Sequence, residues 1–232
     1  IAEEAPSLCP TAAVKRMDLD TTRGKHAFGD LSRAVENGEV DILVGTQMVT
    51  KGLDFDRVGL VGIMSADNLL SFPDFRANER AFQLIEQVAG RTGRRTSKGK
   101  VVIQAMKPRH SIIQLALNHD FTGMQAKELA VRQEYQYPPF VRLITITLKH
   151  RDQKLLQRAA GEFARSLHSK IGDRFLGPEF APISRLKNLY QMQIIVKVDK
   201  GSIGAKVRER IKKSHQEALL TPDFNRVKVV FD

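Results

Sequence analysis

Asp41-Ile42-Leu43-Val44-Gly45 is a short apolar run with a carboxylate at one end and a glycine at the other. A run of this kind is typical of a strand that is buried on both faces, which is the usual strand of a parallel sheet. Two further apolar runs follow at residues 58–64 and 100–106. A run in which apolar and polar residues alternate precedes the first apolar run, at residues 14–20. The first half of the chain is therefore predicted to contain four strands.

Two helical segments are expected between these strands, at residues 25–37 and 76–88. Gly38 follows the first of them, and glycine is a common residue just beyond the end of a helix. Strands that alternate with helices at this spacing predict a parallel sheet covered by helices. We therefore expect residues 1–108 to form an α/β domain.

Tyr137-Pro138-Pro139-Phe140 marks the expected domain boundary, because proline removes a backbone donor and restricts the residue before it. A polar, mostly helical connector is expected at residues 109–136. After the boundary the pattern predicts a strand at residues 141–149 and a long amphipathic helix at 152–171. Two extended segments follow at 174–184 and 190–199, separated by residues 185–189. A helix at 203–211 and a last strand at 227–231 complete the domain. This β-α-β-β-α-β order predicts a ferredoxin-like α+β domain at residues 137–232.

The chain is strongly basic, with 37 Lys and Arg against 26 Asp and Glu and a net charge of +11. Nucleic acid is the leading partner that such a charge implies, although an anionic membrane surface or an acidic protein stays open. The chain contains no apolar run of 18 residues, so no membrane span is expected. Cys9 is the single cysteine, which excludes an internal disulfide and a cysteine-rich zinc site, and we expect it to pack against apolar neighbours. Because Ile1 already reads as domain interior, we expect the chain to be part of a longer protein.

Gln87-Val88-Ala89-Gly90-Arg91-Thr92-Gly93-Arg94-Arg95 follows the second expected helix. Arg91 and Arg94 flank a glycine, and the planar guanidinium group presents several donors to a phosphate. A solvated basic helix end is the alternative interpretation.

A second polar stretch follows the strand at residues 41–45. Ligands of parallel sheets bind beyond the carboxyl ends of the strands. Small hydroxyl and glycine positions allow a phosphate to approach the backbone, and a carboxylate can accept a hydrogen bond from a ribose hydroxyl. The residues at this place are Thr46, Gln47, Lys51, Gly52 and Asp54. A loop of purely structural importance is the alternative.

Together these two stretches resemble motifs V and VI of superfamily 2 helicases, which belong to the second of two RecA-like lobes. Residues 16–22, 65–67 and 73–84 narrow the resemblance to the family of bacterial primosomal protein N′, the replication-restart DNA helicases. The resemblance is dense over residues 16–107 and thinner afterwards. It implies a RecA-like lobe 2 and then a C-terminal domain likened to ribosomal protein S10.

The resemblance also implies roles for individual residues. The motif VI arginines that reach the ATP phosphates match Arg91 and Arg94. The nucleotide-binding positions match Gly52, Asp54, Gln87 and Gly90. The DNA-binding positions of motif V match Thr46, Gln47 and Lys51. The sequence has no Gly-x-x-x-x-Gly-Lys-Ser/Thr motif. We therefore expect ATP and Mg²⁺ to be bound together with a lobe 1 that this chain lacks, and the chain alone to be inactive in ATP hydrolysis.

As a whole, the resemblance implies an ATP-dependent 3′-to-5′ DNA helicase that remodels stalled replication forks and restarts replication by primosome assembly. Its expected partners are forked and single-stranded DNA, the single-stranded-DNA-binding protein and other primosome proteins, in the bacterial cytoplasm at the nucleoid. The zinc-binding cysteines of the family lie upstream and are absent here, so no metal ligand is expected. A non-catalytic nucleic-acid-binding scaffold, or an RNA helicase or translocase of the same superfamily, stays open.

The second domain offers a basic helical stripe formed by Lys206, Arg210 and Lys213, which lie at positions i, i+4 and i+7. The stripe is either a DNA contact or a solvated face. Asn188-Leu189-Tyr190-Gln191 departs from the charged residues that many members of the family have there. Tyr190 either stacks on a base or packs in the core, and we favour packing.

Overall fold

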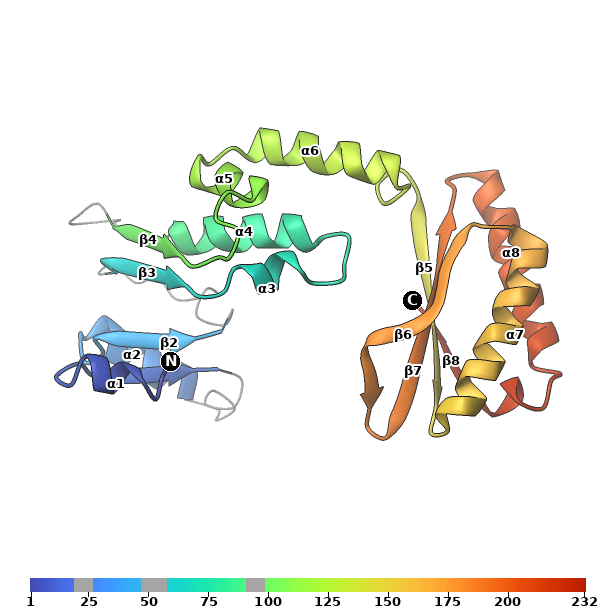
Figure 1. Ribbon diagram of the computed structural model, residues 1–232, viewed down its shortest axis with the longest axis horizontal. Coiled ribbons are helices and arrows are strands. Elements are labelled where there is room, and N and C mark those ends of the chain that lie inside the picture. Colours follow the sequence, from blue (N-terminus) through green and yellow to red (C-terminus); the bar gives the residue numbers. More distant parts are fainter. Residues whose placement is uncertain (19–26, 47–57, 91–98) are drawn as a thin grey trace. The chain divides into compact units, whose positions relative to one another are not determined.

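The computed structural model describes residues 1–18, 27–46, 58–90 and 99–232 (Figure 1). These residues form two compact units, residues 1–126 and residues 127–232. Among the described helices, none is both long and apolar enough to cross a membrane.

The strands of the first unit pair in parallel, as the sequence predicts. β1 (Val14–Met17) pairs with β2 (Ile42–Gly45), with Met17 opposite Gly45. β3 (Leu60–Ile63) pairs with β4 (Lys100–Ile103), with Ile63 opposite Ile103. The carboxyl ends of the two strands in each pair therefore lie next to each other.

The described helices of the first unit are α1 (Ala5–Leu8), α2 (Ala27–Glu36), α3 (Asp67–Leu70), α4 (Ala77–Ala89), α5 (Ser111–Leu117) and α6 (Phe121–Glu134), whose last turns belong to the second unit. The main core is formed by α4, α5 and the start of α6, with apolar residues of α3, β3 and β4 packed against them. Phe82 and Ile85 of α4 are buried together with Ile112 and Ile113 of α5. A smaller cluster surrounds the fully buried Met17.

Two expectations for the first unit are wrong. The strands predicted to be buried are not buried on both faces, because β2 contains no buried residue and Leu60 of β3 is 62% exposed. In β4, which pairs with β3, Val102 is 57% exposed. The alternate residues Ile63 and Ile103 pack against the helical core, so the described helices cover one face of this pair. Cys9 is exposed, because the short helix α1 before it buries none of its residues.

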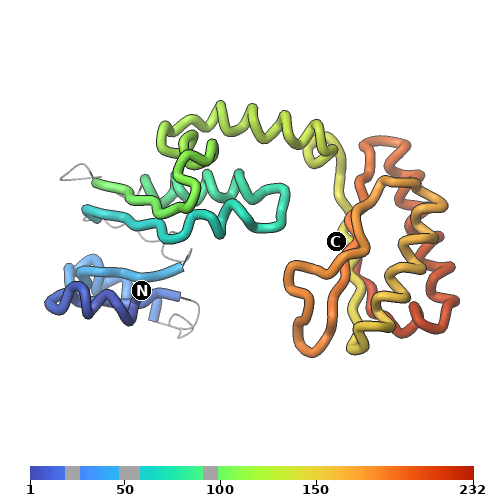
Figure 2. The backbone as a smooth tube through the Cα atoms, viewed as in Figure 1, coloured from blue at the N-terminus to red at the C-terminus, as the bar shows by residue number. Residues whose placement is uncertain are grey.

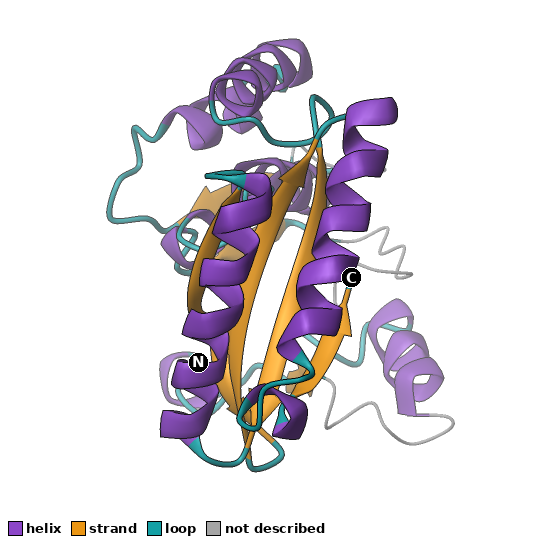
Figure 3. Cartoon of the chain, turned by 90° about the vertical axis from the view of Figure 1, so that its right-hand side faces the viewer, coloured by secondary structure: helices purple, strands orange, loops and turns teal. Residues whose placement is uncertain are grey.

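The second unit contains the predicted order of elements. They are β5 (Arg142–His150), α7 (Gln153–Ile171), β6 (Phe175–Leu186), β7 (Leu189–Val198), α8 (Ser202–Ala218), the short 3-10 helix η2 (Phe224–Arg226) and β8 (Lys228–Phe231). The strands form one antiparallel sheet in the order β6-β7-β5-β8. Helices α7 and α8 lie across one face of this sheet (Figure 3).

Alternation along the central strands builds the core of this unit. Ile146 of β5 and Ile194 of β7 lie opposite each other and are fully buried beneath Phe163 of α7. Asp152 begins α7 by accepting hydrogen bonds from the backbone nitrogens of Leu155 and Lys154, at 3.1 and 2.8 Å. The bond from Leu155 is the main reason that the pKa of Asp152 lies below its ordinary value.

The hairpin of β6 and β7 is longer than predicted (Figure 2). A loop was expected at residues 185–189, but Leu186 pairs with Leu189, and only Lys187 and Asn188 connect the strands. Both residues have positive φ angles, of 49° and 63°, which matches the right-handed twist of a two-residue hairpin.

Candidate nucleotide and nucleic-acid interface

Helix α4 precedes the arginine motif, and its start is fixed by Asp74. The Asp74 carboxylate accepts a hydrogen bond from the Arg76 nitrogen at 2.9 Å and forms an ion pair with Arg80 at 2.8 Å. The buried face of α4 consists of Ala77, Ala81, Phe82 and Ile85. These contacts hold the first three turns of the helix against the core.

The end of α4 lies at Gly90, whose nitrogen donates to the Glu86 carbonyl oxygen at 2.9 Å. Gln87 and Gly90 are both exposed, so a ligand can reach them. Arg91 and Arg94 lie outside the described residues. The chain therefore enters the arginine motif directly from the last turn of a well-packed helix. The arginines that follow this accessible helix end have the donor chemistry that phosphates require, whereas the carboxyl end of the helix itself carries partial negative charge.

Thr46 follows β2 at the carboxyl end of the first strand pair and is exposed. The other predicted residues of this stretch, Gln47, Lys51, Gly52 and Asp54, lie outside the described residues. Asp18 follows the neighbouring strand β1 at the same edge, is 9% exposed and forms an ion pair with Arg16. Asp18 is not among the predicted site residues, because the first strand was predicted to continue to residue 20, whereas β1 ends at Met17 and leaves Asp18 directly after it.

Lys206, Arg210 and Lys213 are all exposed on α8, as one stripe requires. The Nη1 atom of Arg210, however, donates to the backbone oxygen of Lys170 at 3.0 Å, in the last turn of α7. A cation at this position stabilises the carboxyl end of α7. Arg210 of the stripe therefore also holds the two helices together, whereas Lys206 and Lys213 are simply exposed.

Further lysines lie on the sheet face opposite α7 and α8. Lys149 of β5 is paired in register with Lys228 of β8, and alternation places Lys197 of β7 on the same face. Tyr190 points to the other face, where it packs against the core with the Arg185 guanidinium 5.1 Å from its ring centre. The prediction that Tyr190 packs is confirmed.

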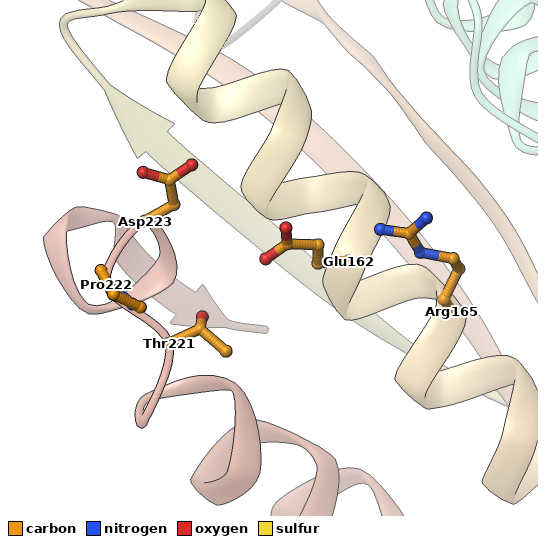
Figure 4. A pocket seen from close by; sticks show the side chains of 5 residues that line it. All are labelled: Glu162, Arg165, Thr221, Pro222 and Asp223. Atoms are coloured by element: carbon orange, nitrogen blue, oxygen red, sulfur yellow. The ribbon is translucent and has the colours of Figure 1, made fainter.

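A pocket lies where α7 meets the segment that follows α8 (Figure 4). It is lined by Glu162, Arg165, Thr221, Pro222 and Asp223. Asp223 is already paired with Arg158 at 3.0 Å, and this hydrogen bond raises the pKa of Arg158. The pocket is open and lies outside the predicted sites, so we assign it no ligand.

Metal binding has no support in the part of the chain that the structure describes, since no group of three or more His, Cys, Asp or Glu residues there could hold a metal ion. His215 instead lies among aromatic rings, 5.1 Å from Phe231 and 5.9 Å from Phe224 between ring centres. Its burial lowers its pKa.

Comparison with known families agrees with both units. Residues 16–96 match the helicase conserved C-terminal domain, and residues 133–232 match the primosomal protein N C-terminal domain. The chain is 43% identical to the replication restart protein PriA of Bacillus subtilis over 85% of its own length, and 42% identical to that of Synechocystis over 78%. A third relative, PriA of Chlamydia pneumoniae, is 33% identical over 96% of the chain.

These matches define a helicase C-terminal domain followed by a primosomal C-terminal domain. The chain belongs to the family of the replication restart protein PriA, as its resemblance to the primosomal helicases predicts. It spans only 25%, 22% and 29% of the length of the three relatives.

Proposed function

We propose that this chain is the part of an ATP-dependent 3′-to-5′ DNA helicase that supplies motifs V and VI. In this proposal residues 1–108 are RecA-like lobe 2, residues 109–136 are a connector and residues 137–232 are a DNA- and partner-binding domain of ferredoxin-like, S10-like fold. The antiparallel sheet order β6-β7-β5-β8, with both helices on one face, supports that last assignment.

The observation that carries the proposal is the end of α4. The helix is buried along one face up to Ile85, ends at Gly90 with Gln87 accessible, and leads directly into Arg91 and Arg94. Negative charge spreads over the γ-phosphate oxygens during phosphoryl transfer, and a positioned arginine contributes about 10³ to 10⁵ in rate. Gly52 and Asp54 would approach the same nucleotide from motif V.

ATP and Mg²⁺ would be bound mainly by another lobe of the intact protein, so this chain contributes arginines and not a complete site. When bound, ATP supplies the phosphoryl group whose transfer to water drives movement along DNA. Thr46, Gln47 and Lys51 would contact the strand backbone, which links the nucleotide state to the grip on DNA. Lys206, Arg210 and Lys213 would add a second basic contact from α8.

At the cellular level, we propose that the intact protein remodels stalled forks and restarts replication by primosome assembly at the nucleoid. The names of the relatives and the matching primosomal domain support this proposal. The proposed partners are forked DNA, the single-stranded-DNA-binding protein and other primosome proteins.

The test is fork unwinding and DNA-stimulated ATP turnover by the intact helicase. Arg94→Ala is expected to lower ATP turnover by about 10³-fold or more. Arg95→Ala, at the adjacent arginine outside the motif match, is the control and is expected to retain turnover. If Arg94→Ala unwinds forks as well as the parent, the helicase proposal is wrong and a scaffold role gains support.

A further inference from the structure

Glu86, on the last turn of α4, is held by a histidine from another part of the first unit. The Nδ1 atom of His119 lies 3.0 Å from each of the two carboxylate oxygens of Glu86. An ionised carboxylate can only accept hydrogen bonds, so Nδ1 is the nitrogen that carries the hydrogen. The contact joins residues 33 positions apart in the sequence.

The backbone of His119 is in an uncommon conformation. His119 follows α5 and has a φ angle of 55°, in the left-handed region that glycine or asparagine adopts most readily after a helix. Its nitrogen donates to the Ala116 oxygen at 3.1 Å, and the next nitrogen, of Asp120, donates to the Leu115 oxygen at 2.9 Å. The turn itself therefore does not require an imidazole side chain.

The contribution of the contact to stability does not explain why a histidine stands at position 119 either. The His119 side chain is 69% exposed and that of Glu86 is 30% exposed. A pair this exposed contributes little to stability, and a left-handed backbone at a non-glycine residue is itself unfavourable. The contact therefore brings no clear gain in stability, and its consequence is geometric.

The contact affects how the last turn of α4 is held. Phe82 and Ile85 pack against α5, but no residue of α4 after Ile85 is buried. The last turn also has no basic residue of its own, and a carboxylate there is unfavourable near the negative end of the helix dipole. The hydrogen bond between His119 and this carboxylate ties the last turn to the end of α5.

We infer that His119, acting through Glu86, is a positioning residue for the arginine motif. The Glu86 carbonyl oxygen accepts the hydrogen bond from Gly90, the residue before Arg91, so the pair fixes the point from which the motif leaves the helix. This inference rests on the proposed function of Arg91 and Arg94. A small displacement of a catalytic group has large effects on rate, because the reacting atoms must be held in line.

The test uses the intact helicase and forked DNA. His119→Gly removes the imidazole and suits the left-handed backbone, so the melting temperature is expected to stay the same or to rise. The kcat for ATP turnover is expected to fall about three- to tenfold, with the KM for ATP and the affinity for the fork changing less than twofold. His119→Arg keeps a donor at this position and is expected to restore most of the lost turnover.

A double variant separates the pair from the backbone. Glu86→Ala combined with His119→Gly is expected to be no slower than His119→Gly alone, because both changes break the same contact. An unchanged kcat in His119→Gly overturns the inference, as does a loss that His119→Arg does not restore. Arg94→Ala is measured in parallel. If Arg94→Ala keeps its ATP turnover, the proposed function itself is wrong. If Arg94→Ala loses turnover but His119→Gly turns over ATP at the parent rate, only the positioning role is rejected.

Discussion

Lys197 of β7 is joined to Tyr135, the residue that follows α6. Its Nζ atom donates to the Tyr135 backbone oxygen at 2.7 Å and lies 4.8 Å from the ring centre of Tyr137. The ammonium group thus combines a charged hydrogen bond at the end of a helix with a cation–π contact. Within the second unit, this side chain fixes the segment that leads into β5.

Replacing Lys197 by methionine is therefore expected to loosen this segment. Loss of the hydrogen bond and the ring contact should lower the free energy of unfolding of the second unit by about 1–2 kcal/mol. Hydrogen exchange at the backbone amides of residues 135–137, 140 and 141 should become faster, while exchange in α8 should change little. Lys197→Arg keeps both interactions and is the control. Unchanged exchange in Lys197→Met would show that packing alone holds the segment.

The second unit could be predicted well from the sequence because its periodicities are strong and its core is built by them. The alternation of β5 and the four-residue repeat of α7 both follow the residues that are buried, such as Ile146, Leu148 and Phe163. The break between β6 and β7 was predicted at residues 185–189, but the shorter turn of Lys187 and Asn188 was not, because a left-handed lysine gives no sequence signal.

In the first unit, the strands and the helices α2 and α4 could be predicted, but the short helices α1 and α3 and the exposure of the strands could not. Apolar runs indicated β3 and β4 correctly, yet Leu60 and Val102 are exposed, because hydrophobicity alone does not say whether a second layer covers a strand. The pairing of Glu86 with His119 was also invisible, since it depends on how two helices pack. The role of Arg91 and Arg94 stays a prediction from the motif.

Two glycines in the second unit should respond in opposite ways to the same substitution. A Cβ atom on Gly204 of α8 would lie 2.0 Å from the Asp199 backbone oxygen, so Gly204→Ala should destabilise by about 1–3 kcal/mol. A Cβ atom on Gly161 of α7 would meet nothing within 4 Å, so Gly161→Ala should stabilise by about 0.5–1 kcal/mol through helix propensity. Urea unfolding of the chain measures both. Equal effects would contradict the close approach at Gly204.

His215 should make stability depend on pH. Burial lowers its pKa below the ordinary value of 6.5, so the unfolded chain binds the proton more readily than the folded one. This contribution is fully present above about pH 6.5, and it is lost as the pH falls from there to the folded pKa. His215→Phe should flatten the dependence in that window, as measured by melting temperature against pH. Titration of His215 by NMR at or above its ordinary pKa would contradict the prediction.

Substitutions in the basic stripe on α8 can distinguish residues that contact DNA from a residue that also stabilises the fold. Lys206 and Lys213 are exposed, whereas Arg210 also donates to the Lys170 oxygen of α7. If the stripe binds single-stranded DNA, each of Lys206→Met and Lys213→Met should reduce the slope of log affinity against log salt by about 0.7, without lowering the melting temperature. Arg210→Met should reduce the slope and also lower the melting temperature, because the end of α7 loses its cation.

Lys212 provides the matched control, since it is exposed on the same helix and pairs with Glu209 at 3.3 Å. Lys212→Met removes the same charge from α8 but from outside the stripe. A stripe that contacts phosphates loses slope in Lys206→Met and Lys213→Met but not in Lys212→Met. If all three variants reduce the slope of log affinity against log salt by the same amount, α8 acts only through the net charge of the chain. The stripe is then a solvated face.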